Sequence, residues 1–208
     1  MIQLGDFGFI WKNEPDKNEI YWMNWLSKKP WTTLVIPGNH ENYFRLLNLP
    51  ETIKFDNPVW VYESPGIEKD IFILQRGYVY NINGVKILAI GGAESIDKYH
   101  RVMNIDWWRE ETLSYEEETR TLQELDKHQW RVDFVLSHTC PLHIAEILCR
   151  ENNFGCTSDT IKDPVSKFLY HISKQLTFKE WHFGHWHVDW QYKNYFCHFL
   201  NPPTLIKE

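Results

Sequence analysis

The sequence predicts one mixed α/β domain built on two β-sheets. The first third alternates short apolar runs with a segment of helical periodicity, which favours parallel strands joined by a helix. The middle third is rich in β-forming runs, two of them joined by Asn83-Gly84, which favours antiparallel pairing. With 208 residues and 43% hydrophobic content, the chain can bury one substantial core. No linker or repeat marks a boundary, so we expect a single domain over 1–208.

The first elements form a βαβ unit. Residues 2–5 are a short apolar run, residues 16–29 have helical spacing with Asp16 as a plausible N-cap, and residues 32–38 form a buried-strand pattern closed by Pro37-Gly38. A strand, a helix and a second strand in this order predict parallel pairing.

The middle of the chain changes character. Residues 71–75, 77–82 and 85–92 each predict a strand, and Asn83-Gly84 predicts a tight hairpin between the last two. We therefore expect antiparallel strands here.

The C-terminal half returns to alternating elements. Residues 114–130 predict a helix, because Ser114 and Glu117 have the spacing of a capping box. The other expected elements are a strand over 132–138, a helix over 163–176, a strand over 178–184, and a strand or hairpin over 190–201.

Composition limits the location and the partners of the protein. No apolar run is long enough to cross a bilayer, and the first residues lack a signal peptide, which predicts a cytoplasmic protein without a membrane partner. A net charge of −6 disfavours nucleic acid as a partner without excluding it. The four cysteines are irregularly spaced, so we expect buried free thiols, with Cys140 a packed thiol and not a nucleophile. The oligomeric state is left open.

Polar side chains follow the predicted strands at the points where they end. They are Asp6, Asn39 with His40, His138, and His185 with His187. Ligands of open α/β sheets bind outside the carboxyl ends of strands, so these side chains are expected to converge on one crevice.

Each of these residues also has a purely structural interpretation. Asp6 and Asn39 could be turn residues, His138 could be a satisfied core histidine, and His185 and His187 could be alternating strand positions. As a set, however, one carboxylate, one amide oxygen and three imidazoles suit borderline first-row divalent metals. The set therefore favours a metal site.

The motifs GD, GNHE, a lone His after an apolar strand, and GHxH follow one another between Gly5 and His187. In this order they resemble the calcineurin-like metallophosphoesterases. The stretch 91–114 also resembles one in bacterial and phage members of the family, with GGA, Asp97, Arg101, Trp108 and Glu111 in similar places. The resemblance implies a four-layer α/β/β/α sandwich of two mixed sheets. It also implies hydrolysis of a phosphate monoester or diester by a metal-activated hydroxide at a dinuclear site.

The resemblance also assigns roles to residues. The implied metal ligands are Asp6, Asn39, His138, His185 and His187. Asp6 would bridge the two metals and His187 would serve the second one, while His40 would lie beside the phosphate, making Asp6 and His40 the catalytic pair. The expected cofactors are two divalent metal ions, with Mn²⁺ favoured over Fe or Zn²⁺. Binding of a single ion is the alternative.

One motif of the family has no counterpart. The family begins with D-x-H on a strand that a helix follows, and nothing ahead of Gly5 matches it. Either the sequence starts downstream of the true beginning, or the protein is a short form without the first strand and helix and with an incomplete second site. The alternative function is therefore a catalytically impaired scaffold that binds a protein partner.

Residues 91–115 have no clean periodicity and are rich in charge and tryptophan. They are either a surface loop or a cap over the cleft, with Arg101 or His100 near the phosphate and Trp107 or Trp108 as a stacking face. The expected substrate is a small phosphorylated molecule. A nuclease is a special case that would need a basic channel.

Overall fold

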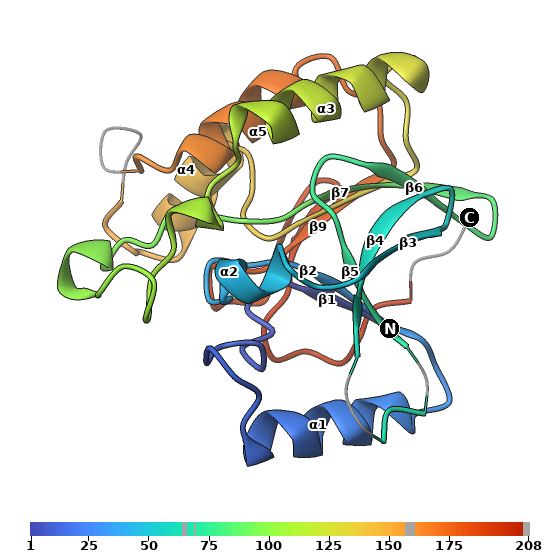
Figure 1. Ribbon diagram of the computed structural model, residues 1–208. Helices are drawn as coiled ribbons and strands as arrows, with labels where there is room; N and C mark the ends of the chain where they lie inside the picture. The colour runs from blue at the N-terminus through green and yellow to red at the C-terminus, as the bar shows by residue number, and fades with distance from the viewer. Residues whose placement is uncertain (64–65, 69, 157–160, 206–208) are drawn as a thin grey trace.

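The computed structural model describes residues 1–63, 66–68, 70–156 and 161–205. Two β-sheets lie face to face between helices, with α3, α4 and α5 on one side and α1 on the other (Figure 1). The two sheets confirm the mixed α/β class predicted from the sequence, and the layers are those that the family resemblance implies.

The first sheet has the strand order β1-β2-β5-β4-β3. Its strands are β1 (Ile2–Leu4), β2 (Thr33–Ile36), β3 (Glu51–Lys54), β4 (Asn57–Tyr62) and β5 (Ile71–Leu74). β1, β2 and β5 are parallel, whereas β4 and β3 run antiparallel to their neighbours. The carboxyl ends of β1 and β2 therefore lie together at one edge.

The second sheet has the strand order β10-β11-β9-β8-β7-β6. Its strands are β6 (Val79–Ile82), β7 (Val85–Ile90), β8 (Phe134–Ser137), β9 (Glu180–Phe183), β10 (Trp190–Tyr192) and β11 (Tyr195–Cys197). The four central strands, β7, β8, β9 and β11, are parallel. The carboxyl ends of β8 and β9 thus also share one edge.

Five α-helices lie in the described residues, and α1 and α3 begin at the caps that the sequence indicates. They are α1 (Lys17–Ser27), α2 (Tyr43–Leu46), α3 (Tyr115–Lys127), α4 (Leu142–Glu151) and α5 (Pro164–Ser173). Asp16 caps α1, and Ser114 with Glu117 forms the complete capping box of α3. Each side-chain cap satisfies backbone N–H groups that the first turn leaves without a partner.

Three apolar clusters hold the layers together. One lies between the sheets, where residues of β2, β4 and β5 meet residues of β7 and β8. The second joins the other face of the second sheet to α3, α4 and α5, and the third joins the outer face of the first sheet to α1 and α2. Close packing on both faces fixes the strand ends in place.

The parallel first unit and the hairpin at Asn83-Gly84 are confirmed. The expected antiparallel pairing holds for β6 with β7, but β5 does not join them: it lies in the first sheet, antiparallel to β4 and parallel to β2. Gly77 has φ +89°, and this left-handed turn takes the chain from β5 to β6 in the other sheet. The β3–β4 hairpin and α4 were not predicted.

The cysteines correct a second expectation. Cys149 and Cys156 form a disulfide across the end of α4, with Cα atoms 5.6 Å apart, so they are not free thiols. Cys140 and Cys197 are free and buried. Burial raises the pKa of Cys140 well above its usual value, so Cys140 is a packed thiol. In the part of the chain that the structure describes, no helix is long and apolar enough to cross a bilayer.

Candidate metal centre

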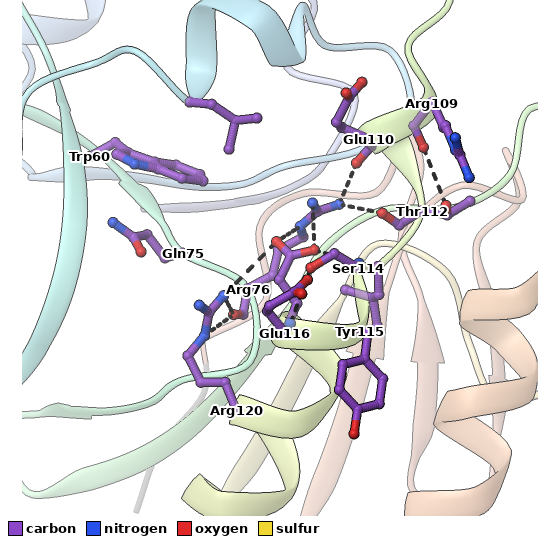
Figure 2. A pocket seen from close by; sticks show the side chains of 13 residues that line it. Trp60, Gln75, Arg76, Arg109, Glu110, Thr112, Ser114, Tyr115, Glu116 and Arg120 are labelled. Carbon is purple, nitrogen blue, oxygen red and sulfur yellow. Dashed lines mark hydrogen bonds and ion pairs between the residues drawn. The ribbon is translucent and has the colours of Figure 1, made fainter.

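A cavity of about 700 Å³ opens beside the N-terminus of α3 (Figure 2). Arg76 and Arg120 line it, but both are engaged by neighbours: Arg76 pairs with Glu117 at 2.8 Å and donates to the Glu110 carbonyl at 2.8 Å, and Arg120 donates to the Arg76 carbonyl at 2.6 Å. The two guanidinium groups are therefore already engaged by neighbouring residues. None of the residues expected to carry chemistry lines it.

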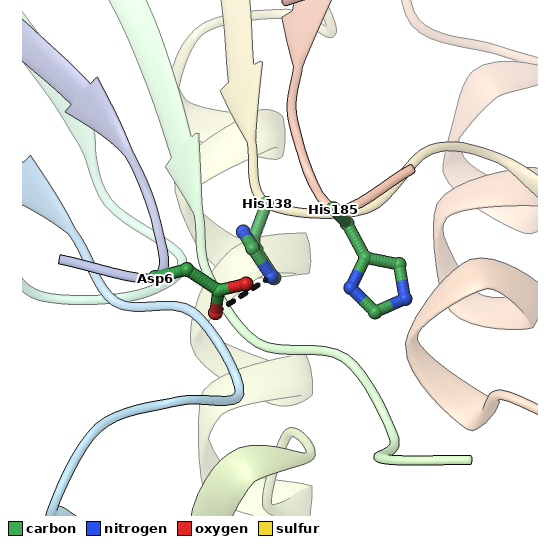
Figure 3. Close-up of side chains that lie close together, drawn as sticks. All are labelled: Asp6, His138 and His185. Carbon is green, nitrogen blue, oxygen red and sulfur yellow. Dashed lines mark ion pairs between the residues drawn. The ribbon is translucent and has the colours of Figure 1, made fainter. Parts of the chain in front are cut away.

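The chemistry gathers at the strand ends (Figure 3). Asp6 follows β1 of the first sheet, and His138 and His185 follow β8 and β9 of the second. One ligand atom from each of these three side chains lies within 4.8 Å of the others. The two sheets therefore bring a carboxylate and two imidazoles together where their strand ends meet.

The backbone at these strand ends is shaped for close approach. Asp6 and His185 both have positive φ, at 49° and 68°, so the chain turns sharply at each of them just after its strand. Gly38 packs directly against Asp6, and a Cβ at this position would overlap the carboxylate. The glycine of the GNHE motif is therefore needed to admit Asp6.

Asn39 supplies a fourth donor atom. Its Oδ1 lies 2.9 Å from His138 Nε2 and 3.2 Å from His185 Nδ1. The side chain is buried, and its Nδ2 donates to Ser95 Oγ at 3.0 Å. The amide oxygen thus faces the two imidazoles.

The protonation of His138 shows that the donor set suits a cation. Its Nδ1 lies 2.8 Å from the Leu4 carbonyl, which can only accept, so Nδ1 carries the ring proton. Its Nε2 then faces two oxygens, Asn39 Oδ1 at 2.9 Å and Asp6 Oδ1 at 3.2 Å. In the neutral ring these three atoms are all acceptors that point at one another. A divalent metal fits such a set, and a second proton on His138 is the alternative.

The pKa values of the cluster follow from the same geometry. Burial opposes ionisation of Asp6, but His138 beside it lowers the pKa of the carboxyl well below its usual range. Burial likewise opposes protonation of His138, yet Asp6 raises its pKa overall. Burial lowers the pKa of His185 to about 3, so this ring keeps its lone pair at neutral pH.

Glu41 holds the loop that carries Asp6. Its carboxyl accepts from the backbone N–H groups of Phe7 at 2.7 Å and Gly8 at 3.3 Å. Complete burial raises its pKa to about 8. The final residue of the GNHE motif is therefore a structural support, a role that the sequence did not reveal.

His40 lies at the mouth of the site, beside Arg101. Its backbone N–H donates to Asp6 Oδ1 at 3.0 Å, and its Nδ1 is 3.5 Å from Arg101 Nη1. Asp97 holds the guanidinium through two contacts of 2.7 and 2.8 Å. Burial lowers the pKa of His40, and Arg101 adds to this while Asp6 opposes it. His40 is thus a neutral imidazole beside a fixed positive charge.

Three expected site residues lie outside the cluster of Asp6, His138 and His185. His187 is exposed, with its ring stacked on Phe199 at 5.1 Å, and His100 is exposed on a short 3₁₀ turn. Trp108 is 1% exposed and packs edge-on against Trp11 in the core, which leaves it no open face for stacking. The described aromatic ring that contacts His40 is Trp11, at 5.9 Å, which the sequence did not single out.

Comparison with known families agrees with this geometry. A family model described as calcineurin-like phosphoesterase matches residues 1–189. The matched span contains Asp6, Asn39, His138, His185 and His40. None of the curated proteins compared with the chain matches it.

Proposed function

Because the chain belongs to the calcineurin-like phosphoesterase family, we propose that it hydrolyses phosphate esters with a metal held by Asp6, Asn39, His138 and His185. The observation that carries the proposal is the convergence of four acceptor atoms on one partly buried point. One carboxylate oxygen, one amide oxygen and two imidazole nitrogens form a borderline donor set, for which Mn²⁺ is the proposed ion ahead of Fe or Zn²⁺. When bound, the metal supplies positive charge to the phosphoryl oxygens and acidifies water.

His40 and Arg101 complete the site from the chain itself. A guanidinium can only donate, so at their contact His40 Nδ1 accepts and its Nε2 carries the proton. That N–H can donate a hydrogen bond to a phosphoryl or leaving oxygen of the ester. The lowered pKa of His40 keeps the ring neutral, so it stabilises charge on that oxygen without transferring a proton.

Arg101 favours a substrate with a compact anionic group. Its guanidinium is held by Asp97 and by the Asp106 carbonyl at 3.0 Å, so it adds fixed positive charge beside His40 without reordering. With a net charge of −6, the chain lacks the overall positive charge that binds nucleic acid without sequence preference. A small phosphate monoester or diester is therefore the proposed substrate class.

The direct test replaces one ligand without changing its shape. Asp6→Asn should lower Mn²⁺-dependent hydrolysis of p-nitrophenyl phosphate and bis-p-nitrophenyl phosphate by at least about 100-fold, because it removes a charge at the reacting centre. Asp56→Asn, at an exposed turn between β3 and β4, is the matched control and should leave the rate unchanged. Equal rates for wild type and Asp6→Asn would contradict the proposal.

The position of His187 favours a second candidate, a scaffold that binds one metal and turns over poorly. His187 lies outside the cluster of the described residues, so the second ion of a dinuclear site would have fewer ligands here. Metal content of the purified protein separates the two functions. Two ions per chain with turnover support the dinuclear enzyme, and one ion without turnover supports the scaffold.

A further inference from the structure

Buried hydrogen bonds lead from the metal centre into the 91–115 segment. Asn39 Nδ2 donates to Ser95 Oγ at 3.0 Å, and Ser95 Oγ donates to Glu111 Oε2 at 2.7 Å. The Ser95 backbone N–H and the Trp107 ring N–H donate to the other carboxylate oxygen, at 2.6 and 2.8 Å. Asn39, Ser95 and Glu111 are each at most 5% exposed, so water does not compete for these contacts.

The Glu111 carboxylate determines the direction of the hydrogen bonds that join Asn39, Ser95 and Glu111. An ionised carboxylate only accepts, so the Ser95 hydroxyl must give its proton to Glu111. The lone pairs of that hydroxyl are then left to accept from the Asn39 NH₂ group. An amide has one oxygen and one NH₂, so fixing the NH₂ on Ser95 turns the oxygen toward His138 and His185.

We propose that Glu111, acting through Ser95, is the positioning residue that makes Asn39 present its oxygen to the metal. The inference rests on the proposed function and assigns the 95–111 segment a part in it. Without this constraint an Asn side chain can flip, and its NH₂ group would then point at the cation and repel it.

Glu111 is itself anchored independently of the metal centre. Arg76 Nη1 donates to the carbonyl of the preceding Glu110 at 2.8 Å (Figure 2), and Arg76 is buried in its ion pair with Glu117 of α3. The same guanidinium lies 3.3 Å from the Tyr43 hydroxyl, which donates to the Gly38 carbonyl at 2.6 Å. Arg76 therefore holds the turn that carries Glu111 and the loop that carries Asn39 in one frame.

The test reverses the direction of the hydrogen bonds between position 111, Ser95 and Asn39 with a side chain of the same shape. In Glu111→Gln the new NH₂ can donate to Ser95 Oγ, the Ser95 hydroxyl can turn to Asn39, and the Asn39 amide flips. The expected result is a loss of Mn²⁺ affinity of about 10- to 100-fold, the usual cost of changing an outer-shell partner, measured by titration calorimetry. The melting temperature of the metal-free protein should stay close to wild type. Glu110→Gln, an exposed carboxyl on the same turn, is the matched control.

A rescue variant separates orientation from general damage. Asp at position 39 presents an oxygen whichever way it turns, so adding Asn39→Asp to Glu111→Gln should restore most of the lost affinity. Failure of this rescue, or unchanged affinity in Glu111→Gln, would overturn the positioning role while leaving the proposed function intact. A wild-type chain that takes up no Mn²⁺ would overturn the proposed function, and the positioning role with it.

Discussion

The two halves of the strand-end region differ in how their side chains are held. On the closed half, the side chains of Asn39, His138 and His185 lie in close contact, and the Leu4 carbonyl sets the His138 tautomer. On the open half, His187 is exposed and contacts the ring of Phe199. The closed half has its donor atoms in place before any ligand arrives, whereas the open half does not.

This difference predicts unequal metal affinities. A ligand set that is already ordered loses little conformational freedom when the ion binds, so more of the interaction energy appears as affinity. The side chain of His138 is 1% exposed, which also keeps water from competing for the ion. We therefore expect the closed half to bind one metal ion tightly and any second ion to bind with lower affinity.

Breaking the closed half should have the largest effect. His138→Ala removes the ring that faces both Asp6 and Asn39, so Mn²⁺ affinity should fall by more than about 100-fold, beyond the usual effect of an outer-shell change. Equilibrium dialysis with elemental analysis measures the loss. His143→Gln changes a half-buried histidine on α4 away from the cluster and should bind metal as wild type does. Retained binding in His138→Ala would mean that the ion sits elsewhere.

Acidification should weaken the closed half by a smaller and graded amount. The raised pKa of His138 means that below it a proton occupies Nε2, which a metal must displace. His185 has a pKa of about 3, and Asp6 stays ionised because its pKa is lowered, so neither takes up a proton between pH 5 and 8. Mn²⁺ affinity should therefore fall by about tenfold per pH unit below the pKa of His138, as for one proton. A two-proton slope in titrations across this range would show that His185 also protonates.

The metal-free protein should show the opposite trend in stability. Because the folded pKa of His138 is raised, its pairing with Asp6 contributes stability below the unfolded pKa near 6.5 and loses it as pH rises through the folded value. The lowered pKa of Asp6 keeps its charge through this range, and its contribution is lost only as pH falls through that lowered value. The increase in melting temperature caused by Mn²⁺ should therefore grow from pH 6 to pH 8, as calorimetry can measure.

The closed half was predictable from sequence because its signals are local. Each ligand follows an apolar run of strand length, and parallel strands place their carboxyl ends together. A glycine stands directly before Asp6, Asn39 and His185. Gly5 has a positive φ, and Gly38 and Gly184 pack closely against Asp6 and the Leu4 carbonyl. The spacing of the motifs and the glycines beside them were therefore enough to predict that these side chains lie together.

What sequence could not supply depends on tertiary packing. The Phe55-Asp56 turn has two positive φ values without an Asn-Gly signature, so the β3–β4 hairpin was invisible. Trp108 is a core residue because the 91–115 segment folds back onto Trp11. No local sequence pattern encodes this long-range contact. The contact of Ser95 with Glu111 spans 16 positions and depends on that same fold-back.

The smallest effect should come from the open half. His187→Ala removes a side chain that is exposed and outside the cluster, so the affinity of the first Mn²⁺ should change by less than about twofold, as is usual for surface substitutions. If His187 serves a second ion, the variant should instead lose a weaker binding step in the same titration, while His138→Ala loses the tight one. A loss of the tight step in His187→Ala would erase the distinction between the halves, because it would require His187 to move into the cluster when metal binds.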